Sequence, residues 1–192
     1  MKHYKYMVFV LFVLIFSGLV FAQEEVDEQQ KAWLEYMTPG DMHTKMAEAV
    51  GEFATVTTYW MYPDAEPMVS EGTAVNKMIL GGRYLQSEHT GVAWGMTMNG
   101  ISLEGYDNAQ QVFKSIWIDN MGTGMAFSTG VFDEETNITT YEGEMVDPVS
   151  GDEIHYQQTL ECSDNDSMLM TMYMDYMGES FKAMTVEFKR KK

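Results

Sequence analysis

Alternation of apolar and polar residues with a period of two dominates the chain from Glu52 onward. This period is typical of strands that bury one face. Turn-forming residues, among them Gly81-Gly82, Asn99-Gly100 and Gly178, interrupt the alternation. The segments between the interruptions are predicted strands: 53–60, 68–80, 83–98, 101–106, 112–118, 125–132, 138–146, 154–162, 168–176 and 181–188. Their connections are too short for helical crossovers, so we expect antiparallel neighbours throughout.

Two short helices are predicted before the strands. Apolar residues recur at helical spacing in 32–37 and again in 42–50. Between these segments, Thr38 suits an N-cap, Pro39 the first helical position and Asp41 the acidic position of a capping box.

The predicted fold class is all-β and mainly antiparallel, with one or two short N-terminal helices. A meander of about ten strands exposes two edges unless it closes, and closure into a barrel removes both edges. We therefore expect a closed barrel, with a two-sheet sandwich as the alternative.

The N-terminus has the order of features found in a secretory signal peptide. Lys2 and Lys5 precede the apolar run Met7 to Val20, and small residues lead to a cleavage site after Ala22. The run is shorter than the roughly 20 residues of a spanning helix, which disfavours the alternative of a retained anchor. We expect a periplasmic or secreted protein without a lipid anchor, because no cysteine follows the run.

This reading divides the chain into three parts. Residues 1–22 are the predicted signal peptide, 23–37 an acidic leader with a short helix, and 38–192 one barrel domain. No linker rich in proline, glycine or serine subdivides the last part.

The charge excludes some partners. The formal net charge is −17, and cleavage would remove two lysines and give about −19. Such a surface repels phosphate backbones and anionic lipids, so we expect neither nucleic-acid binding nor membrane docking. The lone Cys162 excludes an intramolecular disulfide.

Several short motifs resemble a known family. They are Gly51-Glu52-Phe53 after the helix that includes His43, then Gly81-Gly82-Arg83, Gly105-Tyr106-Asp107 and Trp117-Ile118-Asp119. In this order, from about Thr38 to Lys189, they resemble the exported bacterial family catalogued as domain of unknown function 1579. Phe53 stands where that family prefers tryptophan. The resemblance implies a lipocalin-like antiparallel barrel and no established reaction.

Methionine is unusually frequent. Of 19 methionines, all but Met1 and Met7 follow the predicted signal peptide, where leucine occurs only six times. Met168, Met170, Met172 and Met174 share one face of a predicted strand, and Trp94, Met96 and Met98 share a face of another. We expect both stripes to point inward.

Three interpretations of the methionine stripes remain open: core filler, an adaptable pocket for an apolar ligand, and a thioether site for Cu(I). We favour a barrel that binds a small apolar or amphipathic molecule in its lumen, with no metal and no cofactor. Its expected wall comprises Trp94, Met96, Met98, Tyr106, Trp117, Met168, Met170, Met172 and Met174.

Enzyme signatures are missing from the sequence. It has no nucleophile elbow, phosphate-binding loop or dinucleotide fingerprint. An acid–base enzyme with lumenal carboxylates such as Glu104 and Asp119, together with a tyrosine, stays an alternative, as does an envelope interaction module. We expect surface or packing roles for His43, His89 and His155.

Overall fold

The computed structural model describes residues 27–164, 166–176 and 178–192. The predicted signal peptide, residues 1–22, lies outside these residues. A compact unit spans Pro39–Lys192, and a helix at residues 27–37 belongs to a separate unit. Among the described residues, no helix combines the length and apolar character needed to cross a membrane.

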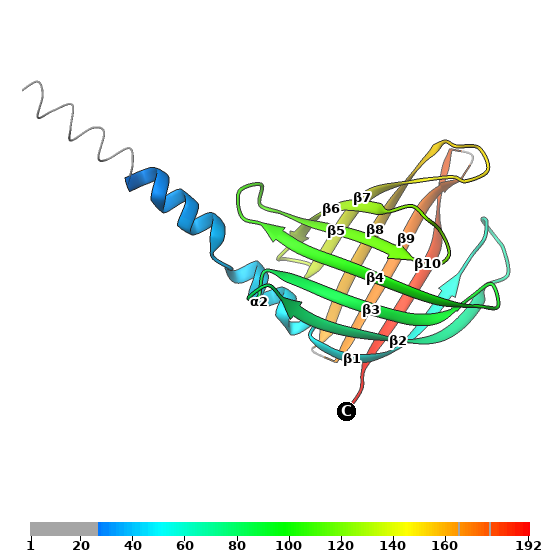
Figure 1. Cartoon of the computed structure of the whole chain (residues 1–192). Helices are drawn as coiled ribbons and strands as arrows, with labels where there is room; N and C mark the ends of the chain where they lie inside the picture. The colour runs from blue at the N-terminus through cyan, green and yellow to red at the C-terminus, as the bar shows by residue number, and fades with distance from the viewer. Residues whose placement is uncertain (1–26, 165, 177) are drawn as a thin grey trace, which may run out of the picture. The chain divides into compact units, whose positions relative to one another are not determined.

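Ten antiparallel strands form a closed barrel, which confirms the predicted fold class (Figure 1). Each strand pairs with its neighbours in sequence, and β1 pairs with β10 to close the ring. The strands are β1 Gly51–Tyr59, β2 Met68–Ile79, β3 Tyr84–Ala93, β4 Met96–Asp107, β5 Val112–Asp119, β6 Ala126–Asp133, β7 Ile138–Val146, β8 Glu153–Asp164, β9 Ser167–Tyr176 and β10 Glu179–Arg190.

The turn between β3 and β4 was predicted at the wrong place. Asn99-Gly100 lies within β4, and the chain instead reverses at Trp94 and Gly95, whose φ angles are 51° and 78°. The dipeptide Asn-Gly favours a hairpin turn, but Gly100 lacks a side chain for another reason, a tryptophan packed over its Cα. The strand count is unchanged because the turn moved without being lost.

Helix α2, Asp41–Glu48, begins two residues later than predicted. Its N-cap is Gly40, whose N–H donates to His43 Nδ1 at 3.0 Å. Thr38 instead donates its hydroxyl to the Leu34 carbonyl at 2.6 Å. The imidazole of His43 therefore provides the capping contact that we had assigned to Thr38 and Asp41.

Helix α2 covers one end of the barrel, which we call the closed end. Met46 of α2 is buried with Leu85, Phe113 and Tyr141 from the strands. Arg190, at the end of β10, donates to the carbonyls of Glu48 and Val50 near the end of α2. These contacts fix the helix to the strands and fill this end with side chains.

The opposite end, which we call the mouth, is open to solvent. Inward-facing residues at the closed end, such as Phe53 and Phe188, are buried. Nearer the mouth, Tyr156 and Ala93 are buried, but several other inward-facing residues are only partly buried although strands enclose them: Met98, Trp117, Gln158, Met170, Met172 and Met174. Solvent can reach an inward-facing side chain only through the space inside the barrel, so the barrel contains an accessible lumen.

Candidate functional site

The lumen has two unlike walls. On one side, Met168, Met170, Met172 and Met174 of β9 face inward, and their cross-strand partners on β8 and β10 face inward with them. Strand β4 lies five places from β9 in the ring and therefore faces it. On that side many inward positions carry small residues: Ser87, Gly91, Gly100, Ser102, Ser115 and Ser128. Small residues opposite flexible thioethers leave interior space that can adapt its shape.

Five of the nine predicted wall residues face inward and are only partly buried: Met98, Trp117, Met170, Met172 and Met174. Of these, Met170 also packs against the closed-end core. Met96 is the first residue of β4 and is 54% exposed at the rim of the mouth. The structure therefore brings most of the predicted set to one space.

Three predicted wall residues lie elsewhere. Trp94 occupies the β3–β4 turn and is 61% exposed. It was predicted on a strand because the turn had been predicted at Asn99-Gly100. Met168 is buried in the closed-end core beside Phe53 and Phe188. Tyr106 packs against His43 and Phe113, also at the closed end.

Trp117 is held in a fixed orientation by its own motif. Its Nε1–H donates to Asp119 Oδ2 at 2.6 Å, and the other oxygen of Asp119 accepts the Met121 N–H at 2.9 Å. The indole lies over Gly100, where an added Cβ would stand 2.3 Å from the ring. The Trp-Ile-Asp sequence and Gly100 thus form one structural unit that presents the indole to the lumen.

His89 contacts this indole on the inner wall. The ring centroids of His89 and Trp117 are 5.1 Å apart with an interplanar angle of 68°, and Phe188 approaches the imidazole from β10 at 6.2 Å. Burial among these rings lowers the pKa of His89 to about 4, because a low-dielectric site disfavours the charged form. The imidazole is therefore neutral at pH 7.

Glu104 and Tyr141 form a second polar element of the interior. The Tyr141 hydroxyl donates to Glu104 Oε2. Burial raises the pKa of Glu104, and the hydrogen bond from Tyr141 opposes that rise. Burial and the neighbouring carboxylate raise the pKa of Tyr141 well above its ordinary value. A carboxyl group and a phenol in contact are suited to hold or transfer a proton.

Glu104 and Asp119, the carboxylates of the alternative acid–base reading, do not meet. Glu104 pairs with Ser115 and Asp119 pairs with Gly100, so the two carboxylates are separated by four residues along the β4–β5 ladder. At roughly 3.3 Å per residue this places their Cα positions about 13 Å apart along the ladder, and the two carboxylates bind different partners, Tyr141 and Trp117. They cannot act on one atom.

Replacing Glu104 with glutamine is expected to remove one component of the pH dependence of stability. The raised pKa means that the folded state holds this proton above pH 4.5, where the unfolded state has released it. The wild-type unfolding free energy therefore falls as the pH rises from about 4.5 through the folded-state pKa. Chemical denaturation at pH 5 and pH 8 should show a smaller fall for Glu104→Gln.

The exposed Glu142 provides the control, because it lies on the outer face and accepts a hydrogen bond from Gln157. Glu142→Gln should reproduce the wild-type slope. If the unfolding free energy changes equally with pH in all three proteins, Glu104 has the same pKa in the folded and unfolded states.

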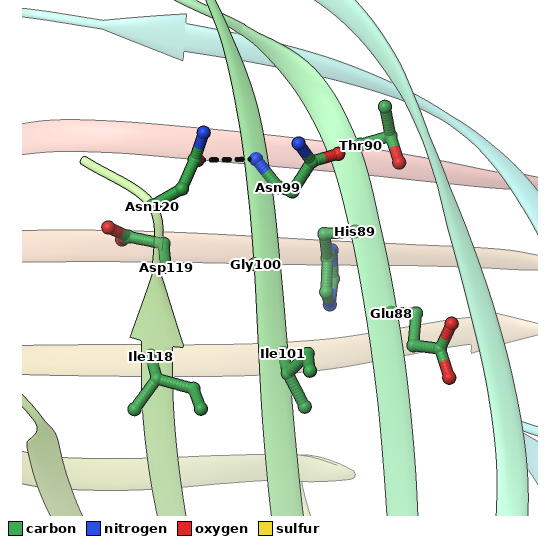
Figure 2. A pocket seen from close by; sticks show the side chains of 9 residues that line it. All are labelled: Glu88, His89, Thr90, Asn99, Gly100, Ile101, Ile118, Asp119 and Asn120. Atoms are coloured by element: carbon green, nitrogen blue, oxygen red, sulfur yellow. Dashed lines mark hydrogen bonds between the residues drawn. The ribbon is translucent and has the colours of Figure 1, made fainter.

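A hollow of about 390 Å³ lies in the wall formed by β3, β4 and the end of β5 (Figure 2). Its lining residues are Glu88, His89, Thr90, Asn99, Gly100, Ile101, Ile118, Asp119 and Asn120. Strand alternation places Ile101 and Ile118 on the outer face, and they are 41% and 36% exposed. Asn120 accepts the Asn99 N–H at 2.7 Å along the same hollow. The lining combines outward-facing residues with the inward-facing His89, Gly100 and Asp119, so the hollow reaches the inner wall beside Trp117.

Sequence reasoning missed His89 and Tyr141 as lumenal residues. The period of two on β3 places His89 on the face of Leu85 and Ser87, which was the available signal. No local signal connects Tyr141 with Glu104, because 37 residues separate them. Only barrel closure brings that pair together.

Other proteins share this fold. The crystal structure of Rv2717c from M. tuberculosis matches this chain with a TM-score of 0.58 and 12% sequence identity. The match covers 81% of this chain and 100% of that protein's chain. The S-type phycobiliprotein lyase CPES from Guillardia theta matches over 83% of this chain and 96% of its own, with a TM-score of 0.54 and 8% identity. No curated protein sequence matches significantly. These likenesses show a lipocalin-like barrel fold.

The family resemblance is confirmed by a match that covers most of the chain and all ten strands. The family described as "Protein of unknown function (DUF1579)" matches residues 38–190. The motifs around Gly51, Gly81, Gly105 and Trp117 all lie within this range. The chain belongs to the DUF1579 family.

Proposed function

We propose that the barrel binds one small apolar or amphipathic molecule in its lumen. The observation that carries this proposal is the partial exposure of the inward-facing residues near the mouth. A barrel packed solid with its own side chains would bury them, as it buries Phe53 and Phe188 at the closed end. Barrels of eight or more strands have room for one such ligand.

The chemistry of the wall supports an apolar ligand. Met170, Met172 and Met174 provide flexible thioether chains, and Trp117 provides a fixed aromatic face. Methionine re-packs around ligands of different shape, whereas a positioned indole fixes orientation. The likeness to a phycobiliprotein lyase supports a barrel of this kind that accommodates a second molecule.

The proposed setting is the periplasm or the exterior of the cell, after cleavage near Ala22. The charged, apolar and small-residue regions of residues 1–22 support this setting. N-terminal sequencing of the protein from the envelope or culture medium tests the cleavage. A chain that begins at Met1 would contradict it.

Native mass spectrometry of protein produced from the full-length chain tests ligand binding directly. We expect a mass increment that organic extraction removes, and a binding capacity of one molecule of a fluorescent apolar probe per chain. The extract then identifies the retained compound. Protein that carries nothing and takes up no probe would contradict the proposal.

The contact between Glu104 and Tyr141 supports a second candidate, an acid–base enzyme for a small hydrophobic substrate. In that role, Glu104 in its protonated form would donate a proton and Tyr141 would position it. Incubation of the extracted compound with wild type and with Tyr141→Phe distinguishes the candidates. Turnover that Tyr141→Phe abolishes favours the enzyme, whereas unchanged compound in both favours a carrier.

A further inference from the structure

His89 has unsatisfied hydrogen-bonding capacity inside the barrel. Its side chain points inward, since it contacts the inward-facing Trp117 of β5 and Phe188 of β10. A neutral imidazole has one N–H donor and one nitrogen acceptor. In the described chain, neither ring nitrogen of His89 forms a hydrogen bond with a protein atom.

These nitrogens are not sealed in the core. Among the described residues, the side-chain polar atom that is both fully buried and without a hydrogen-bond partner is Asn76 Oδ1, and the ring nitrogens of His89 do not meet both conditions. The nitrogens of His89 therefore retain accessible surface, although the residue is not exposed. A ligand that displaced water from this imidazole without replacing its hydrogen bonds would leave a polar atom unpaired, at a cost in affinity. A polar group on a bound molecule would remove this cost.

In the part of the chain that the structure describes, no lysine or arginine is placed to pair with an anionic ligand near the mouth of the lumen. Lys77, Lys114, Lys182 and Lys189 lie on the outer face of the strands. Lys45 donates to Asn137 and lies over the Phe132 ring at the closed end, and Arg83 is exposed in the β2–β3 turn, where it donates to the Leu80 carbonyl. Arg190 is engaged at the closed end by carbonyl groups, the Phe53 ring and Asp166. The carboxyl groups of Glu104 and Asp119, in contrast, both face inward. Within the described chain, the lumen is thus neutral to acidic, and the whole protein has a net charge of −17.

We propose that His89 is the polar recognition residue of the lumen, and that the ligand is an uncharged or cationic amphipathic molecule whose hydrogen-bonding group faces this imidazole. Carboxylates and phosphate-bearing lipids are disfavoured, because an anion would be desolvated among carboxyl groups without a counter-charge. This inference rests on the proposed function and adds the chemical class of the ligand.

Probes of matched chain length test the charge preference. Dodecanol, dodecylamine as its ammonium, and dodecanoate are titrated at pH 7 into the full-length protein, below their aggregation concentrations, in competition with a fluorescent apolar probe. We expect dodecanol and dodecylamine to displace the probe, and dodecanoate to bind about tenfold more weakly or worse. Equal or tighter binding of dodecanoate would overturn this inference and leave lumenal binding intact. If neither the fluorescent probe nor any competitor binds, the proposed function fails as well.

The role of His89 itself is tested by substitution. His89→Leu should weaken dodecanol binding about 2- to 12-fold, the range for one lost hydrogen bond, and leave binding of the purely apolar probe unchanged. His89→Gln keeps a donor and an acceptor and should restore part of the affinity. His155→Leu is the control, because His155 pairs with Glu144 on the outer face. Unchanged dodecanol affinity in His89→Leu would show that the imidazole does not recognise the ligand.

Discussion

Replacing Gly91 with tryptophan is expected to weaken ligand binding strongly while the barrel remains folded. Gly91 faces the lumen on β3, opposite Met98, and its φ lies in the range open to all residues. An added Cβ would meet only ordinary contacts, the nearest being the Met98 methyl carbon at 3.8 Å. The indole would therefore extend into lumenal space without backbone strain.

The size of this effect follows from the ligand surface that the indole displaces. A ligand that loses the burial of about four methylenes, at about 0.8 kcal/mol each, binds about 200-fold more weakly. Titration with a fluorescent apolar probe measures this change. Circular dichroism and thermal unfolding verify that the barrel is retained.

Val92 provides the matched control on the same strand. It is the next residue of β3, points outward and is 46% exposed. Val92→Trp adds an indole of the same size to the outer face and should leave probe affinity unchanged. If Gly91→Trp binds the probe as well as Val92→Trp does, the ligand does not occupy the lumen.

Replacing Phe53 with alanine should destabilise the barrel by about 3–5 kcal/mol, the usual range for truncating a buried aromatic residue. Phe53 has no exposed surface. Its ring packs edge-on against Phe188 at 6.3 Å, and the Arg190 guanidinium lies 4.6 Å above it. Truncation would leave a cavity at the closed end and remove the surface beneath a charged group. Urea denaturation measures the loss.

Val56→Ala, on the same strand, separates burial from strand propensity. Val56 faces outward and is 38% exposed, so its truncation should cost less than about 1 kcal/mol. Similar losses for Phe53→Ala and Val56→Ala would mean that the closed end contributes little to stability.

The sequence by itself determined the class of the fold. The period of two from Glu52 onward, broken by turn residues such as Gly81-Gly82, specified ten strands. Short connections left only antiparallel neighbours, and closure removes the edges that a meander would expose. The same alternation placed Met170, Met172 and Met174 on one face, because side-chain direction in a strand depends only on local geometry.

Local sequence patterns gave a wrong prediction where glycine can serve either a turn or close packing. Gly100 reads as a turn residue after Asn99, yet it lies within β4 because the Trp117 ring requires its missing side chain. That contact joins residues from different strands. The error at Gly100 also moved Trp94 from a turn onto a predicted strand.

Only the tertiary structure decided what lies inside the barrel. Met168 fills the closed-end core, whereas Met172 faces inward and is only partly buried. This difference depends on the distance of each residue from α2 along the barrel axis, which no spacing in the sequence encodes. The contact of Tyr141 with Glu104 and the enclosure of His89 by Trp117 and Phe188 also arise when distant strands close into a ring. The burial of a side chain and its contacts with distant strands depend on how the barrel closes. The polar groups of the lumen could therefore be identified only from the tertiary structure.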